Sequence, residues 1–223
     1  MMKGKLIIIE AGDGCGKATQ TKALFEHLQR DGRRIRQVEF PDYGSESSAL
    51  IKLYLKGEFG KHADDVNAYA ASTFFAVDRY ASFRMNWKKD YDEGAIILAD
   101  RYTTSNMVHQ AVKIKNAEER QCFLDWLWDF EFSKMGLPIP DAVVFLDVPP
   151  QISNELIAKR AQAEHSVKDI HEADQEYLKR CYGAYQELVG KYDWLKVDCT
   201  KDGQLKTVEE IHQAVYEAVC QRL

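Results

Sequence analysis

Residues 5–20 read Lys-Leu-Ile-Ile-Ile-Glu-Ala-Gly-Asp-Gly-Cys-Gly-Lys-Ala-Thr-Gln, and this stretch decides the fold. The apolar run Lys5–Glu10 predicts a buried β-strand, and the face shared by Leu24 and Leu28 predicts a helix after it. Between them, glycines let the backbone curl so that successive N–H groups point inward at the helix N-terminus, where they can bind an anion. Lys17 adds a cation that can reach the β- and γ-phosphates of a nucleotide. The stretch therefore predicts a phosphate-binding loop.

This loop departs from the strict Walker A pattern at two positions. Ala11 stands where the pattern has its first glycine, and Ala18 stands where it has Ser or Thr after the lysine. The alternative is a tight strand-to-helix turn that binds nothing. The strand before and the helix after favour the phosphate loop, and we expect the nucleotide to contact Gly12, Asp13, Gly14, Cys15, Gly16, Lys17, Ala18 and Thr19.

Five short apolar runs divide the rest of the chain and predict its architecture. They are Lys5–Glu10, Ile35–Phe40, Ala95–Ala99, Ala142–Asp147 and Trp194–Val197. Segments with helical periodicity lie between them, one with a predicted buried face at Ala70, Phe74, Val77 and Ala81 and the last with one at Ile211, Val215 and Val219. Strands that are apolar throughout and alternate with helices indicate a parallel sheet covered on both faces. We expect residues 1–223 to form a single doubly wound α/β/α domain with a five-stranded parallel sheet.

Composition excludes several function classes. The net charge of −5 gives no global basic field to hold a nucleic-acid polymer, so any phosphate is expected to bind locally. The five scattered cysteines show no metal or redox spacing, and we expect Cys15 to fill space in the loop. No stretch approaches the roughly 20 apolar residues that cross a bilayer. We expect a cytoplasmic protein without a signal peptide.

Ligands of such sheets bind beyond the carboxyl ends of the strands. Asp100 and Arg101 follow the predicted buried strand Ala95–Ala99. A carboxylate at a strand end beside a phosphate loop is suited to anchor Mg²⁺ through water, and an arginine can donate two hydrogen bonds to a phosphate. The alternative is a surface ion pair between neighbours.

Two further segments could contribute to a nucleotide site. Phe75 and Arg79 are four residues apart, so on a helix they share a face and could stack on a flat base and donate to its carbonyl edge. Taken alone, the pair is better explained by a core ring beside an arginine that reaches water. The charged segment from about 155 to 179 is typical of a solvated hairpin or of a lid over phosphates.

Together these segments resemble the thymidylate kinases over nearly the whole chain and in the same order. The glycine loop of that family is similar to Glu10–Gln20, its Phe-Pro turn to Phe40-Pro41, its phenylalanine and arginine pair to Phe75 and Arg79, and its Asp-Arg-Tyr triplet to Asp100-Arg101-Tyr102 with Ser105 following. The stretch Gly136–Asp141, before the fourth strand, is similar to a segment of many members.

The resemblance implies reversible transfer of the ATP γ-phosphoryl group to dTMP with Mg²⁺, giving dTDP, by a homodimer. It implies that Phe75 stacks on thymine, that Arg79 addresses a thymine carbonyl and that Arg101 holds the acceptor phosphate. Asp13 would accept from the sugar 3′-hydroxyl, and His109 would crowd the 2′ position. The dTMP-binding set that it implies is Asp13, Phe40, Pro41, Tyr43, Phe75, Arg79, Arg101, Ser105, His109 and Gln110.

The chain departs from the family pattern in its cations and its magnesium ligand. Ala18 lacks the hydroxyl that usually contacts Mg²⁺, and Tyr43 replaces an arginine of eukaryotic members. Neither Gly14 nor the lid after Arg160 supplies the usual catalytic arginine, so Arg160, which also maps to an adenine contact, and Lys168 are the candidates. The expected catalytic set is Lys17, Asp100, Arg101, Arg160 and Lys168, with Asp100 acting on the metal through water.

Two alternatives stay open at this point. A deoxynucleoside kinase also uses a phosphate loop, but it typically has Glu-Arg-Ser where this chain has Asp100-Arg101-Tyr102, and it needs no cation for an acceptor phosphate. A nucleotide-binding regulator with weak or no kinase activity would agree with Ala18 and with the arginine-poor lid.

Overall fold

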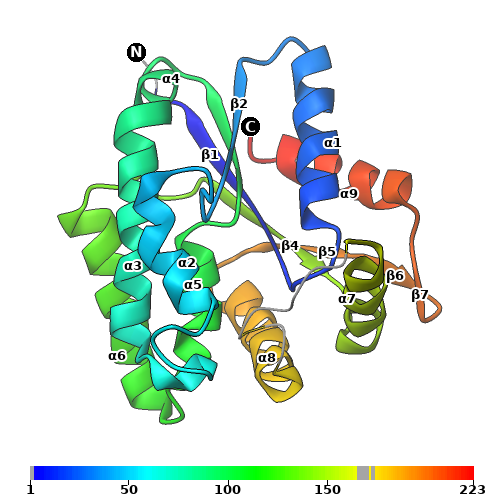
Figure 1. The fold of residues 1–223 in the computed structure, drawn as a ribbon. Coiled ribbons are helices and arrows are strands. Elements are labelled where there is room, and N and C mark those ends of the chain that lie inside the picture. The colour runs from blue at the N-terminus through cyan, green and yellow to red at the C-terminus, as the bar shows by residue number, and fades with distance from the viewer. Residues whose placement is uncertain (1–2, 165–170, 172–173) are drawn as a thin grey trace.

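The computed structural model describes residues 3–164, 171 and 174–223. Its central sheet has five parallel strands in the order β2-β3-β1-β4-β5 (Figure 1). The strands are β1 (Lys5–Ala11), β2 (Ile35–Glu39), β3 (Ile96–Asp100), β4 (Ala142–Asp147) and β5 (Leu195–Asp198). All five predicted runs form strands, with bounds within one residue of those expected. The side chains of β3 and β4 are buried throughout because helices cover both faces.

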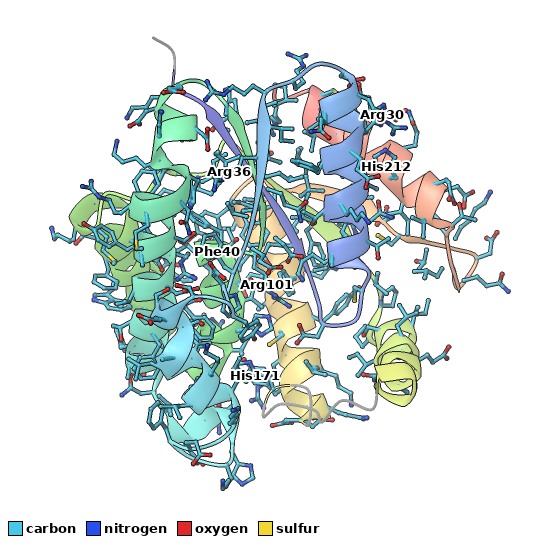
Figure 2. The ribbon with its side chains drawn as sticks, turned by 45° about the horizontal axis from the view of Figure 1, so that its top comes forward. Arg30, Arg36, Phe40, Arg101, His171 and His212 are labelled. Carbon is cyan, nitrogen blue, oxygen red and sulfur yellow. The ribbon has the colours of Figure 1, made fainter. Side chains whose placement is uncertain are left out.

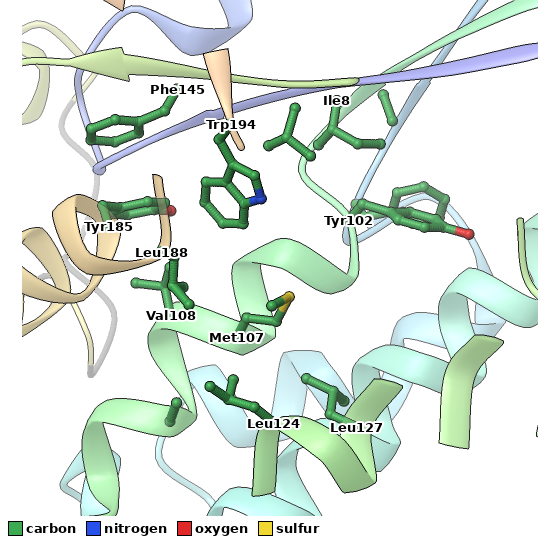
Figure 3. Packing of buried hydrophobic residues seen from close by; sticks show 14 of the residues in the cluster. Ile8, Tyr102, Met107, Val108, Leu124, Leu127, Phe145, Tyr185, Leu188 and Trp194 are labelled. Atoms are coloured by element: carbon green, nitrogen blue, oxygen red, sulfur yellow. The ribbon is translucent and has the colours of Figure 1, made fainter. Parts of the chain in front are cut away.

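Helices pack on both faces, which confirms the three-layer architecture. On one face, α1 (Lys17–Arg30) and α9 (Val208–Cys220) cover apolar side chains of β1 and β4. The other face is covered by α3 (Ala68–Ser82), α5 (Thr103–His109), α6 (Ala117–Trp128) and α8 (Gln175–Lys191). Figure 3 shows this second core, in which Tyr185 and Leu188 pack near Phe145 and Trp194 while Met107 faces Leu124 and Leu127.

Shorter elements complete the fold. The remaining helices are α2 (Ala49–Leu55), α4 (Lys88–Asp92) and α7 (Pro150–Glu164), with 3₁₀ turns at Glu46–Ser48, Ala63–Asp65 and Ala111–Lys113 and π-helical turns at Phe83–Trp87 and Asp129–Lys134. A small antiparallel hairpin joins β6 (Thr200–Lys201) to β7 (Gln204–Leu205). Among the described residues, no helix is both long enough and apolar enough to cross a membrane.

The predicted buried face of α3 is wrong. Val77 is 49% exposed, whereas Ala71, Ala76, Asp78 and Arg79 are buried. The apolar periodicity placed the core on the wrong side because α3 directs a charged aspartate and arginine inward. Both side chains have partners there: Asp78 accepts from the Asp42 N–H at 2.9 Å, and Arg79 is paired as described below. The predicted faces of α1 and α9 are confirmed, since Leu24, Leu28, Ile211, Val215 and Val219 are buried.

Candidate active site

The phosphate loop lies at the carboxyl edge of the sheet, between β1 and α1. Gly14 and Gly16 have φ angles of +72° and +76°, a left-handed conformation that only glycine adopts without strain. Gly16 is the N-cap of α1, so the loop leads directly into the positive end of a long helix. Cys15 is buried in the loop, and burial raises the pKa of its thiol to about 12. Its neutral, buried state fits the predicted role of a filler.

Lys17 and Asp100 lie side by side at this edge. The strand register pairs Ile9 with Asp100, which brings the end of β3 next to the loop. The Nζ of Lys17 lies 2.9 Å from Oδ1 of Asp100. The two residues that the sequence predicts for phosphate and metal therefore lie in direct contact. Asp100 is buried at the end of β3, which does not agree with the alternative of an ion pair at the surface.

Arg101 is held in a strained conformation beside the loop. Its φ of +67° is unusual for a residue with a side chain, and such strain is typical of functional positions. Its Nη2 donates to Asp13, and its Nη1 donates to Oγ of Ser105 at 3.1 Å and faces Nε2 of His109 at 3.3 Å. Burial by itself would raise the pKa of Asp13, but the charge of Arg101 lowers it to about 2. Asp13 is therefore a carboxylate at neutral pH.

One cavity opens beside Arg101, and Phe40, Arg101 and His171 lie around it (Figure 2). It encloses about 560 Å³, part of which is open solvent. All of the residues predicted to bind the acceptor line it, namely Asp13, Phe40, Pro41, Tyr43, Phe75, Arg79, Arg101, Ser105, His109 and Gln110. Leu55, Tyr102, Asn106 and His171 complete the lining and were not predicted.

Phe75 and Arg79 reach this cavity from α3, one turn apart. The guanidinium of Arg79 is fixed by Glu131, to which Nε and Nη2 donate at 2.7 and 2.5 Å. Thr103 donates to the same carboxylate at 2.7 Å. Nη1 of Arg79 makes only long contacts, at 3.4 Å to Asn106 and 3.5 Å to the Tyr102 carbonyl oxygen. The structure thus anchors one edge of the guanidinium and leaves Nη1 weakly bonded.

Two neutral histidines close the cavity on the side of α8. The rings of His109 and His171 are stacked with centroids 5.8 Å apart. Burial, with the charge of Arg101 acting in the same direction, lowers the pKa of His109 to about 4. Burial also lowers the pKa of His171, to about 3. The hydroxyl of Tyr54 lies 2.8 Å from Nε2 of His171 and links that histidine to α2.

The turn after β2 is fixed from α3. Phe40-Pro41 is a cis peptide bond, and the backbone continues to Asp42, whose N–H donates to Asp78. The hydroxyl of Ser47 donates to the other oxygen of Asp78 at 2.5 Å. Tyr43 is 52% exposed at the mouth of the cavity. The predicted Phe-Pro turn therefore faces the cavity at a position set by a buried aspartate.

Glu10 and Glu131 are the principal residues that sequence reasoning missed. Both are fully buried and bonded to residues of the site. Glu10 gave a usable signal, since it is a charged residue inside an otherwise apolar strand. Glu131 gave none, because it lies in a charged and aromatic stretch 52 residues from its partner Arg79.

The predicted lid cations are not both described. Arg160 lies in α7, but its side chain, like the whole of Lys168, lies outside the described part of the chain. Within the described part, α7 covers the phosphate loop, since Ile157 is the neighbour that a Cβ on Gly14 would meet. No group of three or more His, Cys, Asp or Glu side chains suited to hold a metal occurs among the described residues.

A phosphate loop at a helix N-terminus, with a cation-bearing cavity beside it in a five-stranded parallel sheet, defines a P-loop kinase that acts on nucleoside monophosphates. Comparison with known proteins agrees. The family model described as thymidylate kinase matches residues 9–215. The chain belongs to the thymidylate kinase family.

Individual thymidylate kinases match this chain over most of their length. The thymidylate kinase of Mycobacterium tuberculosis is 34% identical over 191 residues, which are 83% of this chain and 86% of the relative. The human thymidylate kinase is 27% identical over 213 residues, covering 96% and 88% of the two chains. The solved structure of thymidylate kinase from Candida albicans superposes with a TM-score of 0.69 at 23% identity, covering 98% of this chain and 92% of that one, and supports the fold.

Proposed function

We propose that the protein transfers the γ-phosphoryl group of ATP to dTMP and forms dTDP and ADP. The observation that carries this proposal is that one cavity is lined by every residue expected to bind the acceptor. Asp13 belongs both to that cavity and to the phosphate loop, so an acceptor in the cavity lies next to the donor's phosphates.

The acceptor's base is recognised on α3. Phe75 lines the cavity with its ring available for stacking on thymine, and Arg79 offers Nη1 to a thymine carbonyl oxygen. Glu131 holds the other two nitrogens of Arg79. The guanidinium is therefore already ordered before the base binds, and binding does not have to fix its position. His109 would exclude a ribose 2′-hydroxyl, and Asp13 would accept from the 3′-hydroxyl.

The transfer needs positioning and charge neutralisation rather than a strong base. An oxygen of the acceptor phosphate forms a bond to the γ-phosphorus while the bond from that phosphorus to the β–γ bridging oxygen breaks. The bridging oxygen keeps the electron pair and leaves as part of ADP. Lys17 and the N–H groups of the loop stabilise the charge on the donor's oxygens, and Arg101 holds the attacking phosphate.

Mg²⁺ fits the site through Asp100. Magnesium binds one or two carboxylates and keeps several water ligands, and Asp100 presents a carboxylate beside Lys17 at the end of β3. When bound, the ion neutralises charge on the β- and γ-phosphate oxygens. We propose that a water takes the place of the hydroxyl absent at Ala18. Arg160 and Lys168 are the proposed lid cations, and a cytoplasmic homodimer is the proposed state of the protein.

A panel of acceptors tests this function. Purified protein with ATP and Mg²⁺ is offered dTMP, dUMP, UMP and dCMP separately, and ADP release is measured. We expect the largest kcat/KM for dTMP and the smallest for UMP. Equal use of UMP and dTMP would contradict the recognition assigned to Phe75, Arg79 and His109. ATP binding without ADP release for any acceptor would support a regulator, the alternative that Ala18 favours.

A further inference from the structure

Glu10 is a buried carboxylate that the proposed reaction does not use. It ends the apolar run of β1, directly behind the phosphate loop, and its side chain is fully excluded from solvent. Three hydroxyl groups bond to it: Thr104 Oγ1 at 2.6 Å, Ser105 Oγ at 2.9 Å from each oxygen, and Tyr185 OH at 3.0 Å. Burying a carboxylate costs free energy unless hydrogen bonds and a nearby cation compensate for it, and the three hydroxyls and Arg101 are the groups that do so here.

Ser105 links this carboxylate to the cation of the acceptor site. Its Oγ is bonded to Glu10 on one side and accepts from Nη1 of Arg101 at 3.1 Å on the other. Nη1 also lies 3.9 Å from Oε2 of Glu10. Arg101 is therefore connected to Glu10 through one hydroxyl and, more weakly, by charge.

The direction of these bonds follows from the chemistry of the groups. Burial raises the pKa of Glu10, and the charge of Arg101 and the hydroxyls of Thr104 and Ser105 oppose that shift. In its ionised form Glu10 can only accept, so the single hydroxyl proton of Ser105 then points to Glu10 and its lone pairs point to Arg101. Likewise Nε2 of His109 must accept from Arg101, because a guanidinium has no acceptor. Both N–H groups of Nη1 are then engaged.

The guanidinium of Arg101 has a second edge, formed by Nε and Nη2. Nη2 donates to Asp13 with one of its two N–H groups, and within the described part of the chain Nε has no hydrogen-bond partner. In an arginine, Nε–H and one N–H of Nη2 project from the same edge of the guanidinium, and such a pair can match two phosphate oxygens. Fixing Nη1 thus determines where that pair points.

We propose that Glu10 is a positioning residue: it orients the hydroxyl of Ser105, which in turn aims the Nε–Nη2 edge of Arg101 at the acceptor phosphate. This inference rests on the proposed function, because it assumes a phosphate monoester in the cavity. Glu10 itself touches neither substrate.

Glu10→Gln tests the proposal with little change of shape. The amide nitrogen donates where a carboxylate oxygen accepted, so the Ser105 proton loses its fixed acceptor and the Ser105 oxygen is shared between the amide and Nη1 of Arg101, which weakens the bond that holds Nη1. We expect the Kd for dTMP to rise roughly ten- to hundredfold, the effect of a lost bond to a charged group, while the Kd for thymidine, which has no phosphate, changes less than about twofold. Loss of the Glu10 charge alone would have the opposite sign and tighten dTMP binding.

Two further variants complete the experiment. Ser105→Ala leaves Glu10 in place, breaks the same link and should weaken dTMP binding selectively; adding Glu10→Gln to it should then weaken binding no further. Thr104→Val removes a hydroxyl that bonds to Glu10 without reaching Arg101, and it is the control for a merely structural loss. It should lower the melting temperature while leaving the ratio of the two Kd values near that of the wild type.

The outcomes separate this inference from the proposed function. Wild-type protein that binds dTMP no tighter than thymidine would contradict the proposed function and the inference with it. A wild-type preference for dTMP that survives in both Glu10→Gln and Ser105→Ala would contradict only the role of Glu10. If Glu10→Gln does not fold, Ser105→Ala still decides, because an unchanged preference in that variant overturns the proposal.

Discussion

Arg79 donates from Nε and Nη2 to the two oxygens of Glu131, and the exposed fractions of the two side chains are only 2% and 0%. The pair joins α3 to the turn after α6 and fixes the arginine that faces the acceptor cavity. A buried, bidentate pair of this kind is expensive to disrupt from one side, because the partner is left charged and unpaired.

Glu131→Gln should therefore lower both stability and affinity. We expect the free energy of unfolding to fall by about 3 to 5 kcal/mol. The KM for dTMP should rise as well, because Arg79 is no longer held on one edge. Urea denaturation and steady-state kinetics measure the two effects. Thr103→Val is the matched control, since it removes one bond to Glu131 and should cost only about 1 kcal/mol. Equal stability of Glu131→Gln and wild type would refute the pairing.

Gly14 and Gly16 provide a controlled comparison within the phosphate loop. Both have left-handed φ angles, but a Cβ on Gly14 would lie 2.6 Å from Cγ1 of Ile157, whereas one on Gly16 would meet nothing within 4 Å. Gly16→Ala should cost about 1 to 2 kcal/mol of stability from backbone strain alone. Gly14→Ala should cost about 1 to 3 kcal/mol more because of the added contact.

A double-mutant cycle isolates that contact. Ile157→Ala removes Cγ1 from α7, so Gly14→Ala should be less destabilising in that background by about 1 kcal/mol or more. Chemical denaturation without nucleotide gives the four free energies of unfolding. Additive effects would mean that α7 does not pack on the loop in solution.

Buried neutral histidines predict a loss of stability at acidic pH. The pKa of His109 falls from its ordinary 6.5 to about 4 through burial, aided by Arg101 and opposed by Asp13. As the pH drops below 6.5, His109 becomes protonated in the unfolded chain but stays neutral in the folded chain. Stability is therefore lost between about pH 6.5 and 4 and is unaffected by this residue at higher pH. At pH 5 the loss from this residue is about 2 kcal/mol.

His109→Gln tests the sign of that effect. Glutamine offers an acceptor to Arg101 but does not titrate, so the drop in unfolding free energy between pH 7 and pH 5 should shrink by about 2 kcal/mol. His171 contributes in the same direction and stays in both proteins, which makes the difference in slope the quantity to compare. An identical slope in wild type and variant would show that the pKa of His109 does not differ between the folded and unfolded states, and it would contradict this prediction.

Ala18 is where the chain departs from the generic phosphate loop. Thr19 follows it on α1 and points about 100° away, so its hydroxyl is not expected to reach the same metal position. If a water replaces the missing ligand, Ala18→Thr should reduce the Mg²⁺ concentration at half-maximal rate and leave the KM for dTMP nearly unchanged. Rates are measured across a magnesium titration. Magnesium-dependent transfer that exists only in Ala18→Thr would show that the wild-type chain is not an active kinase.

The sheet could be predicted from the sequence because the central strands β3 and β4 are buried along their whole length, whereas the edge strands β2 and β5 keep apolar residues at only some positions. Each of the five runs could be recognised without knowing its neighbours, and the glycine loop marked one strand end. The face of α3 could not be found this way. Asp78 and Arg79 point inward because Asp42, Ser47 and Glu131 meet them, and periodicity assumes that the buried side is apolar.

The site was predicted unevenly for a similar reason. Residues next to substrate, such as Phe75 and Arg101, belong to short local patterns that can be matched one at a time. Residues that hold them in place, such as Glu10 and Glu131, act through partners 28 to 175 positions away in the chain. Those partners come together only in the folded chain, where α3 and α5 pack at the end of the sheet.

The central claim is that the acceptor is a nucleotide and not a nucleoside. The most direct measurement incubates the protein with ATP, Mg²⁺ and either dTMP or thymidine at equal concentration, and quantifies dTDP and dTMP as products by chromatography. Because Arg101 lines the cavity and is held by Ser105 and Glu10, we expect rapid formation of dTDP from dTMP and no dTMP from thymidine. Preferred turnover of thymidine to dTMP would contradict it.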